Sequence, residues 1–150
     1  PVAKVPGARL LLVIAPYYRD IADQLQRGAE AVASEAGATL DRVFVPGAFE
    51  IPGAVALAAR TKAYDGFVAL GCVVRGETSH YDYVCGESAR GLMELSTRKR
   101  LAIGYGILTV DTIAQAEERA DPMRGDKGGE ATRAAIAMIA LKRRFAETTK

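Results

Sequence analysis

The chain has 150 residues, of which 49% are hydrophobic and 25% are charged, with a formal net charge of +2. This length suits one ordinary globular domain, and the charged fraction is average for folded proteins. We therefore expect residues 1–150 to form a single domain and exclude a disordered chain or a coiled coil. The net charge is too small to predict a nucleic-acid surface. The two densest basic clusters, 98–100 and 142–144, lack the interleaved aromatic residues of single-strand binders.

No segment predicts a membrane span or an export signal. No apolar run approaches the roughly 20 residues that cross a bilayer. Pro6 and Gly7 interrupt the N-terminus where a signal peptide would be apolar. We therefore expect a soluble, cytoplasmic protein that binds neither membrane nor nucleic acid.

The residues that bind metals and common cofactors are scarce. Cys72 and Cys85 form no CxxC pair, and His80 is the only histidine, whereas a zinc site needs three or four such ligands at short spacing. A disulfide between the cysteines is not expected in a reducing cytoplasm. The glycine-rich loops that bind dinucleotides and triphosphates are also absent. We expect no metal and no cofactor.

Apolar runs alternate with amphipathic stretches along the chain. Continuous apolar runs predict strands at 9–15 and 66–74, and two further strands are expected at 40–45 and 101–109. Helical periodicity predicts helices at 21–36, 51–58, 79–99 and 130–145. A further short helix is expected to begin at a capping box formed by Thr112 and Gln115 and to end before Pro122. Residues 125–129 are expected to form a flexible glycine turn. This order predicts an α/β fold, namely a doubly wound, four-stranded parallel sheet with helices on both faces, a three-layer α/β/α sandwich.

In such a sheet the ligand site lies beyond the carboxyl ends of the strands. Of the loops expected there, the first contains Tyr17 and Tyr18, whose rings could stack on a flat heterocycle, although one of them could equally cap the edge of the core. In the second loop, Glu50 could accept hydrogen bonds from hydroxyl groups or simply favour a helix N-terminus. A lone histidine is more often structural, but the position of His80 at a helix start, beside hydroxyl side chains, favours proton transfer. Near the last loop, Lys127 at a helix start is a candidate anion site, or a solvated charge.

Three segments together resemble one enzyme family. VPGAFEIP (45–52), GCVVRGETSHYDYV (71–84) and GILTVDTIAQAEERA followed by GDKGGEA (106–131) closely resemble 6,7-dimethyl-8-ribityllumazine synthase, the penultimate enzyme of riboflavin synthesis. The resemblance runs in order from about Arg9 to Phe145. It implies the same α/β fold and a transferase that joins 5-amino-6-(D-ribitylamino)uracil to 3,4-dihydroxy-2-butanone 4-phosphate, with release of phosphate and water and without a cofactor.

The resemblance also implies a role for individual residues. The proton-transfer residue would be His80. The residues that would contact the aminouracil are Tyr17, Ala48, Phe49, Glu50, Cys72, Val73, Val74 and, from the neighbouring subunit, Tyr105. The residues that would contact the butanone phosphate are Glu77, Thr78, Arg119 and Lys127.

The family's assembly is implied in the same way. Its members form homopentamers with active sites between adjacent subunits, and in some members twelve pentamers close into a 60-subunit shell; the sequence leaves pentamer and shell open. The resemblance further implies an association with riboflavin synthase. Residues 1–8 form an N-terminal extension that could pair with a neighbouring subunit.

The sequence departs from the family pattern at two places that matter for binding. Pro16-Tyr17-Tyr18 replaces a common Arg-Phe-Asn, which keeps an aromatic ring but loses the flanking polar groups. Glu77 replaces a small residue, and since a carboxylate would repel phosphate, we expect it to point outward or to contribute its backbone. Two alternatives remain: a flavin mononucleotide carrier, which would need a hydroxyl-rich first loop, and a non-catalytic relative that only binds ligand or assembles.

Overall fold

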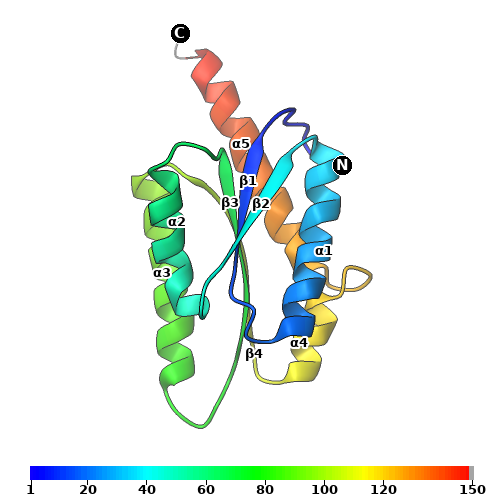
Figure 1. Ribbon diagram of the computed structural model, residues 1–150, viewed down its shortest axis with the longest axis vertical. Helices are drawn as coiled ribbons and strands as arrows, with labels where there is room; N and C mark the ends of the chain where they lie inside the picture. Colours follow the sequence, from blue (N-terminus) through cyan, green and yellow to red (C-terminus); the bar gives the residue numbers. More distant parts are fainter. Residues whose placement is uncertain (149–150) are drawn as a thin grey trace.

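Four parallel strands form one sheet in the order β2-β1-β3-β4 in the computed structural model, which describes residues 1–148 (Figure 1). The strands are β1 (Arg9–Ile14), β2 (Thr39–Phe44), β3 (Gly66–Val74) and β4 (Ala102–Val110). The helices are α1 (Arg19–Ala36), the short 3₁₀ helix η1 (Ala48–Glu50), α2 (Ile51–Ala59), α3 (His80–Arg98), α4 (Ile113–Ala120) and α5 (Lys127–Thr148). The predicted α/β fold with a four-stranded parallel sheet is confirmed.

The central strands β1 and β3 are covered on both faces, which explains why they are almost entirely apolar, whereas the edge strand β2 contains Asp41 and Arg42 and is mostly exposed. Successive side chains of a strand point to opposite faces, so Leu10 and Leu12 pack with α1, α4 and α5, whereas Leu11 and Val13 pack with α2 and α3. Figure 1 shows these two helical layers on either side of the sheet. Among residues 1–148, no helix combines the length and apolar character needed to cross a membrane.

The strands do not end at the same level. β1 pairs with β3 only as far as Ile14 opposite Leu70, whereas β3 and β4 remain paired to Val74 opposite Val110. The last residues of β3 therefore have a paired strand on the β4 side alone. This difference in length positions the candidate site described below.

The start of the last helix, α5, differs from the prediction. Residues 125–129 were expected to form a flexible turn before a helix at 130, but α5 begins at Lys127, after Asp126, whose carboxylate accepts a hydrogen bond from the Gly129 N–H at 3.3 Å. Gly128 and Gly129 are instead buried at the crossing of α5 with α1. A Cβ atom on Gly128 would lie 2.0 Å from the carbonyl oxygen of Leu25, so glycine here allows close helix contact rather than a turn.

Two predicted helix ends are confirmed by their hydrogen bonds. Gly37 adopts the left-handed conformation that ends α1, with φ of 79°. At the start of α4, the Gln115 N–H donates to Thr112 Oγ1 and the Thr112 N–H donates to Gln115 Oε1, which completes the expected capping box.

The first eight residues pack against the core of their own chain. Val2, Val5 and Ala8 are buried in the core beneath α1 and α5, and the Val5 N–H donates to the carbonyl oxygen of Ala36 at 2.9 Å. The pairing of 1–8 with a neighbouring subunit stays a prediction.

We predict that Gly128→Ala lowers the free energy of unfolding by about 2 kcal/mol or more, because the new methyl group meets backbone atoms that cannot move aside. The matched control is Gly86→Ala in α3, where a Cβ meets nothing within 4 Å and the helical preference of alanine should stabilise by roughly 0.5–1 kcal/mol. Urea unfolding of both variants checks this. Equal stabilities for Gly128→Ala and the unmodified chain would contradict the close crossing.

Candidate active site

A cavity of about 470 Å³ opens at the carboxyl ends of the strands, where the sequence predicts the ligand site. Eight of the predicted site residues line it together: Tyr17, Ala48, Phe49, Glu50, Cys72, Val73, Val74 and His80. They come from the ends of β1 and β3, from η1 and from the start of α3. Segments far apart in the chain thus meet in one pocket large enough for a small molecule.

The two tyrosines after β1 have different environments. The Tyr17 side chain is 76% exposed, whereas Tyr18 is half-buried and packs against the core beneath α1. Their rings meet edge to face, with centroids 4.9 Å apart. Tyr18 therefore caps the core edge and supports Tyr17, which leaves the Tyr17 ring free to stack on a ligand.

The segment after β2 brings a carboxylate to the cavity. Ala48 is buried and anchors η1, while Phe49 and Glu50 are exposed. Glu50 precedes α2, but its side chain makes no capping hydrogen bond to that helix. Its carboxylate can therefore accept hydrogen bonds from hydroxyl groups in the cavity, which favours the ligand-binding alternative over a purely structural one.

The end of β3 presents backbone groups to the cavity. Since β1 stops opposite Leu70, the segment from Gly71 to Val74 is paired with β4 alone. Cys72, Val73 and Val74 are half-buried and line the cavity with this unpaired edge. Backbone N–H and C=O groups along such an edge can bind the polar edge of a flat ring.

His80 is the first residue of α3, and its side chain is exposed and lines the cavity. Its own backbone N–H donates to Thr78 Oγ1 at 3.3 Å. Glu77 and Thr78 are exposed and are not among the residues that line the cavity, and an outward Glu77 agrees with the expectation for this departure.

Three other predicted residues lie away from this cavity. Tyr105 is in the middle of β4, where its side chain lies near Ser88 of α3. Arg119 on α4 donates to the carbonyl oxygen of Gln115 at 3.2 Å, and Lys127 pairs with Glu130 at 3.0 Å. The residues of one chain that line the cavity include no lysine or arginine.

Three lining residues are not among those that the family resemblance assigns: Tyr18, Gly47 and Val84. Tyr18 was a candidate from its loop alone, and Val84 lies within the helix predicted at 79–99. Because Val84 lies four residues after His80, the two share one helical face, and this spacing was the signal that could have identified it. Across residues 1–148, no group of three or more His, Cys, Asp or Glu side chains could hold a metal ion.

Burial raises the pKa of the Cys72 thiol to about 11, and the nearby Cys85 contributes. The thiol is therefore protonated at neutral pH, which does not suit a nucleophile. Cys72 contributes to the cavity by its backbone and its shape.

We predict that in Cys85→Ser, where Cys72 is the only cysteine, the rate of alkylation by iodoacetamide still rises about tenfold per pH unit between pH 9 and 10. An unshifted thiol, with a pKa of 9.0, would level off there. Because folding raises this pKa, the unfolded chain loses the proton first, and this group's contribution to stability falls as the pH rises from about 9 to 11. The chain unfolded in urea is the control, and a plateau near pH 9 in the folded protein would contradict the shift.

Comparisons with known proteins agree with the geometry. A sequence model of the family described as 6,7-dimethyl-8-ribityllumazine synthase matches residues 7–143. The protein of that name from Novosphingobium aromaticivorans is 54% identical and aligns over 92% of this chain and 99% of its own length. The protein of the same name from Methylobacterium radiotolerans is 56% identical, over 91% of this chain and 84% of its own length. The chain belongs to the 6,7-dimethyl-8-ribityllumazine synthase family.

Proposed function

We propose that this chain, in the cytoplasm, condenses 5-amino-6-(D-ribitylamino)uracil with 3,4-dihydroxy-2-butanone 4-phosphate to form 6,7-dimethyl-8-ribityllumazine in riboflavin biosynthesis. Family membership supports the reaction. The observation that carries it is the single cavity in which Tyr17, Glu50 and His80 meet. An association with riboflavin synthase, which would take up the product, belongs to the same proposal.

The cavity offers a group for each part of the aminouracil. The pyrimidine ring stacks on Tyr17, and its polar edge pairs with the backbone of β3 from Cys72 to Val74. The ribityl hydroxyls donate hydrogen bonds to the Glu50 carboxylate. This orientation leaves the reactive amine toward His80 at the start of α3.

In the reaction, the amine attacks the butanone carbonyl and loses water to form an imine, phosphate is eliminated, and ring closure expels a second water. Each step moves a proton, and the His80 imidazole both accepts and donates protons. A positioned acid–base contributes roughly 10²–10⁴-fold, whereas holding two reactants in register contributes as much as about 7–11 kcal/mol. Binding geometry is therefore the larger contribution, because an amine and a ketone already react readily.

The phosphate of the second substrate needs cations that the cavity of one chain does not supply. The residues that line the cavity include a carboxylate, Glu50, but no lysine or arginine. Arg119 and Lys127, the cations that the family resemblance assigns to phosphate, lie on α4 and α5. We therefore assign them, with Tyr105, to the cavity of an adjacent copy.

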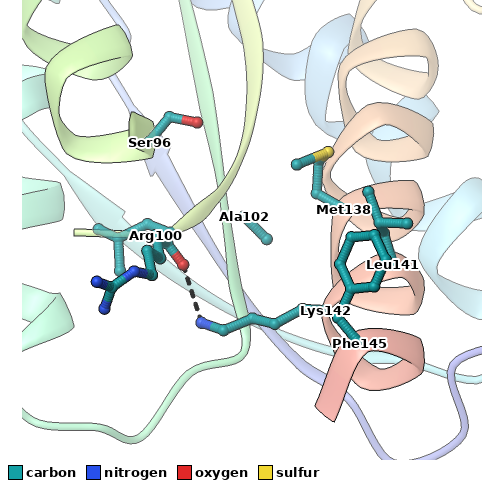
Figure 2. Close-up of a pocket in the computed structure, with 8 residues that line it drawn as sticks. Ser96, Arg100, Ala102, Met138, Leu141, Lys142 and Phe145 are labelled. Carbon is teal, nitrogen blue, oxygen red and sulfur yellow. Dashed lines mark hydrogen bonds between the residues drawn. The ribbon is translucent and has the colours of Figure 1, made fainter. Parts of the chain in front are cut away.

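Exposed apolar side chains at both edges of the sheet support such an assembly. Val43 and Phe44 are exposed on the edge strand β2. At the opposite edge, β4 and α5 enclose a second cavity of about 320 Å³, where Met138, Leu141 and Phe145 face Ala102 (Figure 2). Because the two apolar edges differ, a head-to-tail contact would cover both, and such contacts form a ring when the rotation between neighbouring copies closes. A homopentamer is the ring that we propose.

We predict that His80→Ala lowers kcat by roughly 10²-fold and leaves measurable turnover, because substrate positioning remains. Arg119→Ala is expected to raise KM for the butanone phosphate about tenfold or more, since a charge-assisted contact to phosphate is lost. Steady-state formation of the fluorescent lumazine measures both. Complete inactivity of the first variant, or an unchanged KM in the second, would contradict these roles.

We further predict that coexpressed His80→Ala and Arg119→Ala chains recover activity. If the two residues of one site come from different chains, about a quarter of the sites in a random 1:1 assembly contain both native residues. His80→Ala chains mixed with His80→Ala/Arg119→Ala chains are the control and should recover nothing. Absence of recovery in a mixture shown by mass to be hetero-oligomeric would rule out a shared site.

A further inference from the structure

The connection between β3 and α3 carries His80 but has little support of its own. Every residue from Arg75 to His80 is exposed, and Ser79, which precedes α3, makes no side-chain cap to the helix. The hydrogen bond from the His80 N–H to Thr78 Oγ1 stays within the connection. Something outside this segment has to hold the start of α3 in place.

The Arg75 side chain makes the contacts that could do so. Its Nε donates to Asp111 Oδ1 at 2.9 Å, and its Nη1 lies 3.7 Å from Asp82 Oδ1. Its guanidinium also lies over the Tyr81 ring, 4.3 Å from the centroid. One guanidinium thus contacts both residues that follow His80 and joins them to the residue after β4.

The partners of Arg75 are themselves fixed. The backbone N–H of Asp111 donates to Gln115 Oε1 at 2.8 Å, within the capped start of α4. Tyr81 is half-buried, and its hydroxyl group lies near Thr109 of β4 and Cys85 of α3. In addition, the Arg75 N–H donates to the carbonyl oxygen of Val110 at 2.8 Å, which extends the β3–β4 pairing by one residue. The guanidinium therefore links the first turn of α3 to the rigid end of the sheet.

We propose that Arg75 is the positioning residue for the proposed reaction, which fixes the His80 imidazole in the cavity by clamping Tyr81 and Asp82 to Asp111. Arg75 is not among the residues that line the cavity, so it acts through His80 and not on the substrates. Its ion pairs are about half exposed, and such pairs contribute little to global stability. Loss of the guanidinium should therefore change catalysis more than folding.

The first experiment compares Arg75→Met with Arg90→Met. Arg90 pairs with Glu87 and Glu94 on the outer face of the same helix and serves as the matched control. Arg75→Met should lower kcat about fivefold to tenfold, with KM for both substrates within about twofold, an unchanged Tm and unchanged oligomer mass. Arg75→Lys should recover part of kcat, because lysine keeps the positive charge but lacks the planar guanidinium group that donates to two carboxylates and stacks on the Tyr81 ring. Equal kcat values for Arg75→Met and Arg90→Met would overturn the proposal.

A double variant separates action through His80 from any other effect. In a His80→Ala background, Arg75→Met should change kcat no further, whereas independent roles would multiply the two losses. If the unmodified enzyme is active and the two losses in kcat multiply, this inference is refuted but the proposed function is not. An unmodified chain that forms no lumazine would refute the proposed function and this inference with it.

The single histidine allows a measurement that does not depend on activity. With ¹³C-labelled histidine, the chain gives one imidazole Cε1 resonance, from His80. A clamped ring should give one narrow signal in the unmodified chain and in Arg90→Met, and a shifted or exchange-broadened signal in Arg75→Met. Identical signals in all three would overturn the clamp.

Discussion

The candidate site depends on a difference in strand length within the sheet. β1 leaves β3 at Leu70, whereas β4 accompanies β3 to Val74, so the last four residues of β3 have one free backbone edge. Unpaired backbone groups at the rim of a sheet seek hydrogen bonds, and a planar heterocycle with alternating donors and acceptors can supply them. The Tyr17 ring, Glu50 and His80 lie around this edge because their segments begin where β1, β2 and β3 end.

The division of charge around the cavity follows from the same arrangement. The carboxyl ends of β1, β2 and β3 contribute aromatic, aliphatic and acidic groups, whereas Arg119 and Lys127 follow β4, at the edge of the sheet. In the proposed ring, one chain would supply most contacts to the neutral aminouracil, with Tyr105 from an adjacent copy, and the phosphate would be bound by the cations of that copy. The chemistry of the two substrates thus gives a reason for the ring that the apolar edges support.

Much of the fold could be predicted because burial on both faces requires continuous apolar strands, as in Leu10–Ile14. The prediction of a flexible turn at 125–129 was wrong, because local sequence does not distinguish a glycine that forms a turn from one that allows two helices to approach closely, as Gly128 does. Tyr17, Glu50 and His80 were candidates from their loops alone, whereas the other predicted residues of the cavity came from family resemblance. The clamp at Arg75 was missed, since its partners Asp82 and Asp111 are brought together by the β3–β4 register and not by spacing in the chain.

In the proposed ring, the contact between Arg75 and Asp111 also connects the segment that carries His80 with the helix that carries Arg119. Asp111 directly precedes the cap of α4, the helix that carries Arg119. In the ring that we propose, His80 would serve the cavity of its own chain and Arg119 the cavity of a neighbour. Because α4 begins with a complete capping box, the contact between Arg75 and Asp111 joins the segment that carries His80 to a helix start that is itself held by hydrogen bonds.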